Sequence, residues 1–354
     1  MKKSLKFVSL VLTMILISTQ FVYAASLPAD PRYATTHQAI ILDTDIGNST
    51  DDLFAMEILY KMMDAGLVDL KGVIVDRPGE GFTELADIEN VYHGYPNIPI
   101  GVERNGILGT HVYIDYRMLD DLKNPDGTKM FARSDTDLSN NLDGYKLYRK
   151  LLAKEPDHSV KVILIGFVSS FVQFLESAPD EYSPLSGQAL ASQKIDSVYI
   201  MATKLGESNE LGYNLRQDIP LAKRFVAELP SNVTTYLSPS PVGDALDYRT
   251  SEVLADLSDV AVHPIKQTYM YKDCNTGQRM WDHLCVLNAV FPGTFVYSER
   301  GDLTINDDAT VNFTPNPNGK FMYQRQGGDK WYAQHYEILR NYTKMKNKMK
   351  NKIK

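Results

Sequence analysis

The chain has 354 residues, of which 44% are hydrophobic and 23% charged, and its formal net charge is −7. This composition is typical of a globular protein and excludes a disordered chain, a collagen-like rod and a small disulfide-rich scaffold. Outside residues 1–24 and 341–354, which carry basic but no acidic residues, 28 Lys and Arg residues face 44 Asp and Glu residues. Such an acidic body repels phosphate backbones, so we expect no nucleic-acid partner.

Residues 1–24 have the pattern of a secretory signal peptide. Three lysines precede a mostly apolar stretch at residues 7–22, and Ala24 ends the predicted cleavage site. The stretch is short and interrupted by polar residues, which argues against a membrane anchor. We therefore expect a secreted or periplasmic bacterial protein with no membrane attachment after cleavage. An oxidising compartment permits a disulfide between Cys274 and Cys285, and two free thiols are the alternative.

Short apolar segments alternate with helical patterns along the chain. Strands are predicted at residues 39–42, 70–75, 98–102, 160–165, 197–201 and 233–237. The helices expected between them span residues 52–65, 83–92, 142–152, 170–176 and 219–229. Continuous apolar strands separated by amphipathic helices predict parallel βαβ units.

The expected fold class is therefore α/β, with a mostly parallel open sheet and helices on both of its faces. Residues 293–326 are richer in turns and alternate polar with apolar residues, so we expect an antiparallel extension at the C-terminal end. A single domain is predicted from residue 25 to 340, followed by a Lys-rich tail at residues 341–354.

Ligands of such sheets bind at the carboxyl ends of the strands. The loop after the first predicted strand carries four carboxylates, those of Asp43, Asp45, Asp51 and Asp52. Crowded carboxylates repel one another unless a cation neutralises them, and hard divalent ions prefer oxygen ligands. Capping of the following helix accounts for one of the four, so the loop predicts a metal site.

Two interpretations of this loop compete. In a magnesium-dependent phosphatase, Asp43 would be the nucleophile and Asp45 an acid. In a calcium-dependent ribohydrolase, the same loop would hold the cation. The phosphatase needs a lysine after the later strand that ends in Ser residues, and the sequence offers none there.

The segment from Asp43 to Asp52 resembles the opening motif of the inosine-uridine preferring nucleoside hydrolase family. A bacterial variant of that motif reads Asp-Thr-Asp-Ile-Gly-Asn-Asp-x-Asp-Asp, and this chain differs from it at one fixed position, Ser49. Later segments resemble further motifs in the family's order, namely residues 72–76, 90–94, 98–102, 163–170, 213–220 and 281–287. The resemblance extends from about residue 40 to 336 and implies the Rossmann-like fold of that family.

The resemblance also implies a calcium site. Its carboxylate ligands would be Asp45, Asp52 and Asp282, and the backbone carbonyl of Ile165 would be a fourth ligand. Water and two hydroxyls of a small ribosyl substrate would complete the 6–8 oxygens that Ca²⁺ favours.

The implied reaction is hydrolysis of the N-glycosidic bond of a ribonucleoside or related ribosyl compound. Asp45 would take a proton from the water that attacks the anomeric carbon. Asp51 and Asn214 would bind ribose hydroxyls, and Asp76 would make a further ribose contact. Members of the family commonly form homodimers or homotetramers, and the sequence leaves the oligomeric state of this chain open.

Besides Ser49, the chain departs from the family pattern at three positions. Gly212 stands where the ribose-binding segment usually has Glu, although Glu207 and Glu210 lie in the same loop. Ser170 replaces the Asn of the strand-turn motif, and Trp281 stands where purine-type members have the His that protonates the leaving base. These departures leave a second hypothesis open, a non-catalytic protein that binds ribosyl compounds in a calcium-dependent way without releasing a base.

Overall fold

The computed structural model describes residues 37–347, apart from residues 48, 110–117, 135–136 and 272–276. The predicted signal peptide, most of the Lys-rich tail and Cys274 lie outside the described residues. Export, the tail and the disulfide therefore stay predictions, and Cys285 is buried. None of the helices in the described ranges combines the length and the apolar character needed to span a bilayer.

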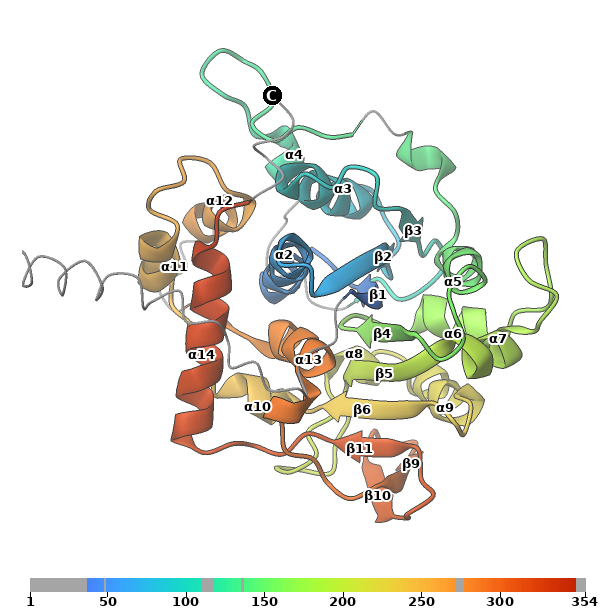
Figure 1. The fold of residues 1–354 in the computed structure, drawn as a ribbon. Helices are drawn as coiled ribbons and strands as arrows, with labels where there is room; N and C mark the ends of the chain where they lie inside the picture. Colours follow the sequence, from blue (N-terminus) through green and yellow to red (C-terminus); the bar gives the residue numbers. More distant parts are fainter. Residues whose placement is uncertain (1–36, 48, 110–117, 135–136, 272–276, 348–354) are drawn as a thin grey trace, which may run out of the picture. The chain divides into compact units, whose positions relative to one another are not determined.

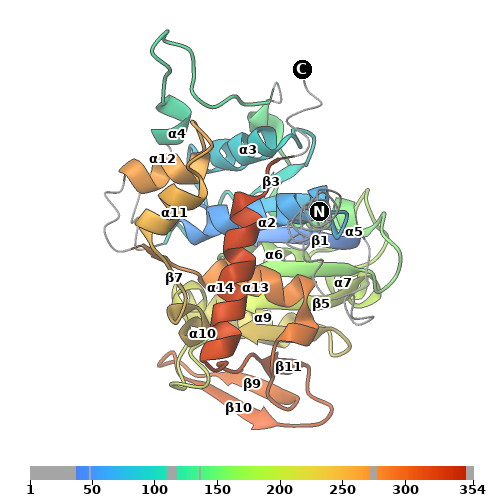
Figure 2. The ribbon, with the colours of Figure 1, turned by 60° about the vertical axis from the view of Figure 1, so that its left-hand side comes forward.

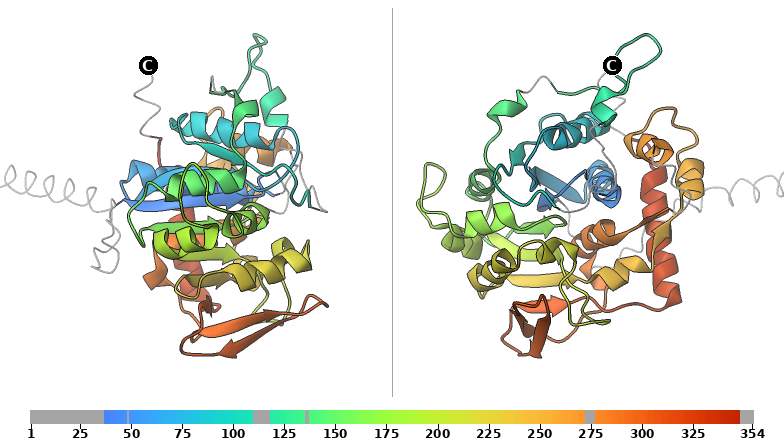
Figure 3. Two further views of the ribbon diagram at one scale, coloured as in Figure 1. Left: turned by 90° about the vertical axis from the view of Figure 1, so that its right-hand side faces the viewer. Right: turned by 180° about the vertical axis from the view of Figure 1, so that it is seen from behind.

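Within the described residues, a nine-stranded sheet has the order β10-β9-β11-β6-β5-β4-β1-β2-β3 (Figure 1). All neighbours from β11 to β3 are parallel, whereas β9 is antiparallel to both β11 and β10. Figure 3 shows β9 and β10 at one end of the sheet. The strands are β1 (Gln38–Thr44), β2 (Val68–Val75), β3 (Ile100–Val102), β4 (Val160–Leu164), β5 (Ile195–Met201), β6 (Thr234–Ser238), β9 (Gly301–Ile305), β10 (Val311–Pro315) and β11 (Phe321–Tyr323).

The predicted α/β class and the antiparallel C-terminal extension are confirmed. Each of the six predicted strands corresponds to one of β1 to β6. The third begins two residues later than predicted, at Ile100, because Pro99 has no backbone N–H to donate to a ladder. Within the extension, β11 turns back to pair with β6 in parallel.

Helices cover both faces of the sheet (Figure 1). On one face lie α2 (Asp51–Asp64), α3 (Phe82–His93) and α13 (Trp281–Val290), and on the other α5 (Gly144–Leu152), α6 (Ser169–Leu175) and α9 (Ile219–Glu228). Outside the first layer, α14 (Asp329–Lys344) packs on α2 (Figure 2), so the predicted boundary at residue 340 falls inside a helix. The remaining elements are α4 (Met118–Asp121), α7 (Gly187–Lys194), α8 (Tyr213–Arg216), α10 (Ser240–Asp244), α11 (Thr250–Asp256), α12 (Pro264–Tyr271), β7 (Asp247–Tyr248), β8 (Gln278–Arg279) and the 3₁₀ turns Leu138–Asn140 and Pro292–Thr294.

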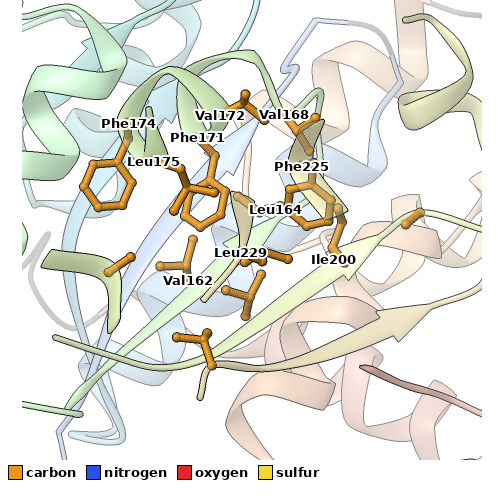
Figure 4. Close-up of a cluster of buried hydrophobic side chains, with 14 of the residues drawn as sticks. Val162, Leu164, Val168, Phe171, Val172, Phe174, Leu175, Ile200, Phe225 and Leu229 are labelled. Atoms are coloured by element: carbon orange, nitrogen blue, oxygen red, sulfur yellow. The ribbon is translucent and has the colours of Figure 1, made fainter. Parts of the chain in front are cut away.

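The core between the sheet and the α6–α9 layer is apolar and fully buried (Figure 4). Side chains of β4 and β5 face aromatic rings from the helices, and the rings of Phe171 and Phe225 lie 6.1 Å apart. This packing orients α6, which follows β4. The labelled members are Val162, Leu164, Val168, Phe171, Val172, Phe174, Leu175, Ile200, Phe225 and Leu229.

The order of the strands places the candidate site. The chain runs from β1 outward through β2 to β3, and then returns to β4 on the other side of β1 before continuing to β5 and β6. The connections after β1 and β4 therefore diverge, and they leave a crevice at the carboxyl ends of these two strands. The predicted acidic loop leaves β1 at this point.

Candidate functional site

Four buried aspartates gather at this crevice. Asp45 follows β1, Asp51 and Asp52 begin α2, and Asp282 lies in the first turn of α13. Each of the four is at most 5% exposed. Carboxylate oxygens of Asp51, Asp52 and Asp282 lie within 4.8 Å of one another. The packing of α13 against α2 brings Asp282 to the acidic loop, from far along the chain.

The turn between β1 and α2 shapes the acidic loop. Gly47 has a φ of +102°, a conformation that L side chains rarely adopt, and a Cβ there would lie 2.6 Å from the ring of Phe82. The Thr44 hydroxyl donates to the Asp52 carboxylate over 2.5 Å. The Ser49 hydroxyl donates to Asp51, so the residue that departs from the family motif contacts a neighbouring site carboxylate.

The end of β4 supplies a backbone carbonyl to the same site. Ile165 donates its N–H to the carbonyl of Asp43 over 2.8 Å, which extends the β1–β4 ladder beyond the strand. Gly166 lets the two segments approach, since a Cβ there would lie 2.3 Å from the backbone nitrogen of Asp45. The side-chain amide of Asn214 donates to the Ile165 carbonyl over 2.8 Å. Asn214 and Ile165 are therefore held together.

One pocket of about 150 Å³ connects these groups, a volume suited to a single sugar ring. Six of the seven residues predicted from the sequence line it: Asp45, Asp51, Asp52, Ile165, Asn214 and Asp282. The pocket is also lined by residues that the sequence did not single out as ligand contacts. These are Ser49, Met201, Tyr213, Ser240 and Trp281. Met201 ends β5 and Ser240 follows β6, so their position after strands was the available signal.

Asp76, the seventh predicted residue, does not line this pocket. It follows β2, is fully buried, and accepts a hydrogen bond from the backbone N–H of Ser170 over 3.2 Å. Burial and the nearby Glu103 raise the pKa of Asp76 to about 8. Its contact with a ribosyl substrate stays a prediction.

Burial and mutual repulsion make the four site carboxylates poor anions on their own. Burial raises the pKa of Asp45 to about 6 and that of Asp51 to about 7. The pKa values of Asp52 and Asp282 lie well above the ordinary range, through burial and through the charges of the neighbouring aspartates. One oxygen of Asp45 has no hydrogen-bond partner within the described residues. Clustered carboxylates, a free carboxylate oxygen and a backbone carbonyl are a donor set that fits a hard divalent cation such as Ca²⁺.

Asp43, the nucleophile of the phosphatase interpretation, does not reach the pocket. Its side chain is fully buried on the face of the sheet that α5 covers, where it accepts a hydrogen bond from the Tyr148 hydroxyl over 2.8 Å. Burial and the nearby Asp76 raise its pKa. A protonated carboxyl with no access to a ligand is a poor nucleophile.

Among the described residues, no glutamate lines the pocket in place of the Glu that the family has at the position of Gly212. The N–H of Gly212 donates to the carbonyl of Ala202 over 2.6 Å, and a Cβ would lie 2.7 Å from that oxygen, so a side chain does not fit here. Glu210 forms ion pairs with Lys204 and Arg216 at the surface.

Two residues of α13, Trp281 and His283, lie at or next to the position where purine-specific members of the family have the His that protonates the leaving base. The Trp281 indole N–H donates to Asp244 over 3.1 Å, and the ring lines the pocket. His283 is fully buried, does not line the pocket, and has its pKa lowered to about 3 by burial. A neutral imidazole outside the pocket is a packed side chain and not a proton donor to a ligand.

The structure is similar to solved structures, although the sequence has diverged far from them. A purine-preferring ribonucleoside hydrolase from Gardnerella vaginalis matches 86% of this chain over 99% of its own length, with a TM-score of 0.66 and 12% identity. The fold is that of the nucleoside hydrolases. An inosine-uridine preferring nucleoside hydrolase from Bacillus anthracis matches 86% of this chain and 99% of its own, with a TM-score of 0.59 and 12% identity.

A third structure of this fold is that of the type III effector protein XopQ complexed with adenosine diphosphate ribose. It matches 89% of this chain and 95% of its own, with a TM-score of 0.63 and 12% identity. No protein-family model and no curated protein sequence matches the chain. The likeness therefore rests on the three-dimensional fold.

Proposed function

We propose that this protein is a calcium-dependent nucleoside hydrolase, which cleaves the N-glycosidic bond of a ribonucleoside or related ribosyl compound. The observation that carries the proposal is the buried cluster of Asp51, Asp52 and Asp282 beside Asp45, at the carboxyl ends of β1 and β4. This donor set fits a hard divalent cation. The fold shared with purine-preferring and inosine-uridine preferring nucleoside hydrolases supports the choice of reaction.

In this proposal Asp45, Asp52, Asp282 and the Ile165 carbonyl hold the cation. When bound, the cation supplies charge that lowers the pKa of an attacking water and fixes its position. Asp51 and the Asn214 carbonyl oxygen are free to accept hydrogen bonds from ribose hydroxyls, since the Asn214 amide already donates to Ile165.

Asp45 takes the proton of the water as its oxygen bonds to the anomeric carbon. The bond from that carbon to the base nitrogen breaks, its electron pair stays with the base, and a proton must reach the base for release. The surrounding carboxylates stabilise the positive charge that develops on the sugar. Trp281 and the half-buried Tyr213 line the pocket and offer aromatic surfaces for a planar base.

A ribosyl-binding protein without turnover is the second candidate. Two observations favour it: the position of Gly212 has no room for a carboxylate, and no histidine lines the pocket within the described residues. The solved effector of the same fold, complexed with adenosine diphosphate ribose, shows that this fold also holds larger ribosyl compounds.

Ribose release from a panel of nucleosides, with added Ca²⁺ and after chelation, distinguishes the two candidates. We expect calcium-dependent release of ribose and free base by the wild type, and at least ~10³-fold slower release by Asp45→Ala, because the general base is lost. Glu299→Ala, which changes an exposed carboxylate, is the matched control and should keep full activity. Calcium-dependent binding of a nucleoside or of adenosine diphosphate ribose without release of a product would favour the binding protein and contradict the hydrolase.

We further infer from residues 1–24 that the protein is exported and acts on ribosyl compounds outside the cytoplasm. Free bases or ribose would then be available for uptake. Its oligomeric state, commonly a homodimer or homotetramer in the family, is measured by light scattering of the mature chain.

A further inference from the structure

Arg77 is a buried cation without a hydrogen-bond partner. It is 1% exposed, and none of its three side-chain nitrogens has a partner within the described residues. A second buried arginine, Arg149, shows the usual arrangement, since it pairs with Asp180 over 2.7 Å and donates to the carbonyls of Ser183 and Leu185. Burial of an unpaired guanidinium is costly, so the position of Arg77 calls for a compensating charge.

Arg77 lies beside the acidic loop. It follows β2 by two residues, and the backbone N–H of Asp76 donates to the Thr44 carbonyl over 2.9 Å, which keeps the two chain segments side by side past the ends of β1 and β2. The guanidinium carbon lies 4.5 Å from the ring centroid of Phe82, the first residue of α3. Gly47 of the acidic loop packs on the same ring. A cation–π contact thus holds the charge beside the loop.

The compensating charge is that of the site aspartates. Arg77 and Gly47 contact the same Phe82 ring, and Gly47 lies two residues after Asp45, so the guanidinium lies near the carboxylates of the acidic loop. The interaction acts at a distance through a buried region, where charges are little screened by solvent. Arg77 therefore favours the ionised carboxylates in the same way as a bound cation would.

We propose that Arg77 is a built-in counter-charge of the acidic site, which supports the carboxylates in the absence of a metal ion and weakens the binding of a divalent cation. The inference rests on the proposed function only in that Asp45, Asp52 and Asp282 hold such a cation. Because two cations beside the same carboxylates repel each other, removal of the charge of Arg77 must tighten cation binding.

Calorimetric titration of Ca²⁺ into the calcium-free mature protein tests this. We expect Arg77→Met to bind Ca²⁺ at least ~10-fold more tightly than the wild type, and Arg77→Lys, which keeps the charge, to stay within about threefold. Arg224→Met is the matched control. Arg224 lies on α9 and forms a half-exposed ion pair with Glu176, so solvent screens its charge. Removal of this charge should leave the Ca²⁺ affinity unchanged. The calcium-induced rise in Tm should be larger for Arg77→Met than for the wild type.

A purely structural role for Arg77 predicts the opposite sign, because a distorted loop would bind Ca²⁺ more weakly. Equal or weaker binding by Arg77→Met, with a wild type that binds Ca²⁺, overturns the inference. No Ca²⁺ binding by the wild type overturns the proposed function instead. Should Arg77→Met fail to fold, Arg77→Gln is titrated, since it removes the charge and keeps a polar side chain at this position. Tighter binding by Arg77→Gln supports the inference, and unchanged or weaker binding contradicts it.

Discussion

At the scale of single residues, the site depends on how far burial shifts the charge of each carboxylate. Asp45 and Asp51 have pKa values of about 6 and 7, in the range where most enzymes work. A protein group that is half-protonated at neutral pH exchanges its proton for a metal ion at little cost. Binding of the cation is therefore expected to depend on pH.

We predict that Ca²⁺ stabilises the protein more at pH 8 than at pH 6. Asp51 is not one of the proposed ligands, but its carboxylate lies within 4.8 Å of those of Asp52 and Asp282, so its negative charge strengthens cation binding. With a pKa of about 7, Asp51 is mostly protonated at pH 6 and mostly ionised at pH 8, so the cation binds more weakly at the lower pH. Without Ca²⁺ the sign is reversed: the folded state holds a proton that the unfolded state has lost above pH 4, so Asp51 reduces stability as pH rises through 7.

Thermal unfolding at both pH values, with Ca²⁺ and with chelator, measures these effects. The difference in the calcium-induced Tm shift should be at least ~3 °C in the wild type. Asp51→Asn has no carboxyl to titrate at this position and should show a smaller difference. A calcium effect of equal size at pH 6 and pH 8 would argue against the raised pKa values.

At the scale of secondary-structure elements, the site is the meeting point of two strand ends and two helix starts. The loops after β1 and β4 are tied by the hydrogen bond from Ile165 to Asp43, and α13 packs against α2. Gly166 is what allows the two strand ends to approach, because its position has no room for a side chain. A small change in the backbone of one element should therefore alter the site without touching a carboxylate.

Gly166→Ala tests this coupling. The added Cβ would lie 2.3 Å from the Asp45 nitrogen, so the Ile165 carbonyl and Asp45 must move apart. We expect a loss of stability of about 2 kcal/mol and weaker Ca²⁺ binding, measured by denaturant unfolding and calorimetry. Gly328→Ala is the control, because nothing lies within 4 Å of a Cβ there. Unchanged calcium affinity in Gly166→Ala would show that the carbonyl does not contribute to the site.

At the scale of the whole molecule, a second buried charge cluster joins α2 to distant parts of the chain. Glu57 of α2 is fully buried between His263, which lies 3.4 Å away, and Lys61, at 3.8 Å. Lys61 also donates to the carbonyl of Met345, in the segment that follows α14. Although burial opposes ionisation, these partners lower the pKa of Glu57 to about 2. The cluster thus fastens the C-terminal segment to the helix that starts the site.

Glu57→Gln should destabilise the fold by about 3 kcal/mol at pH 7, because it leaves Lys61 buried without its anion. Denaturant unfolding measures the loss, and Asp307→Asn, which removes the almost fully exposed partner of Lys223, should change stability by less than about 1 kcal/mol. The contribution of Glu57 is present above pH 4.5 and lost as pH falls toward 2, since its folded pKa is lowered. An equal loss of stability in the two variants would mean that the buried cluster stabilises the fold no more than an exposed ion pair does.

Local pattern in the sequence was sufficient for the parallel sheet and for the acidic loop, whereas Ile165, Asn214 and Asp282 were predicted from the family resemblance. Mostly apolar runs such as residues 160–165 lie between helical segments. This pattern is typical of a parallel sheet whose two faces are covered by helices, and β4 is largely buried in the structure. Six of seven predicted site residues line one pocket because strand ends of a parallel sheet meet at one edge. Asp76 is the exception, since its side chain points to Ser170 on the opposite face, and alternation along a strand is lost where the strand ends.

What the sequence by itself determined is the α/β class and the crowding of carboxylates after the first strand, because both follow from short-range spacing. Only the tertiary structure decided that Asp282 lies in the cluster, that Asp43 is turned away from it, and that the buried Arg77 has no hydrogen-bond partner within the described residues. The position of Asp282 depends on the packing of α13 on α2, which joins segments distant in sequence. The pKa values depend on the same packing, since burial is a property of the folded chain.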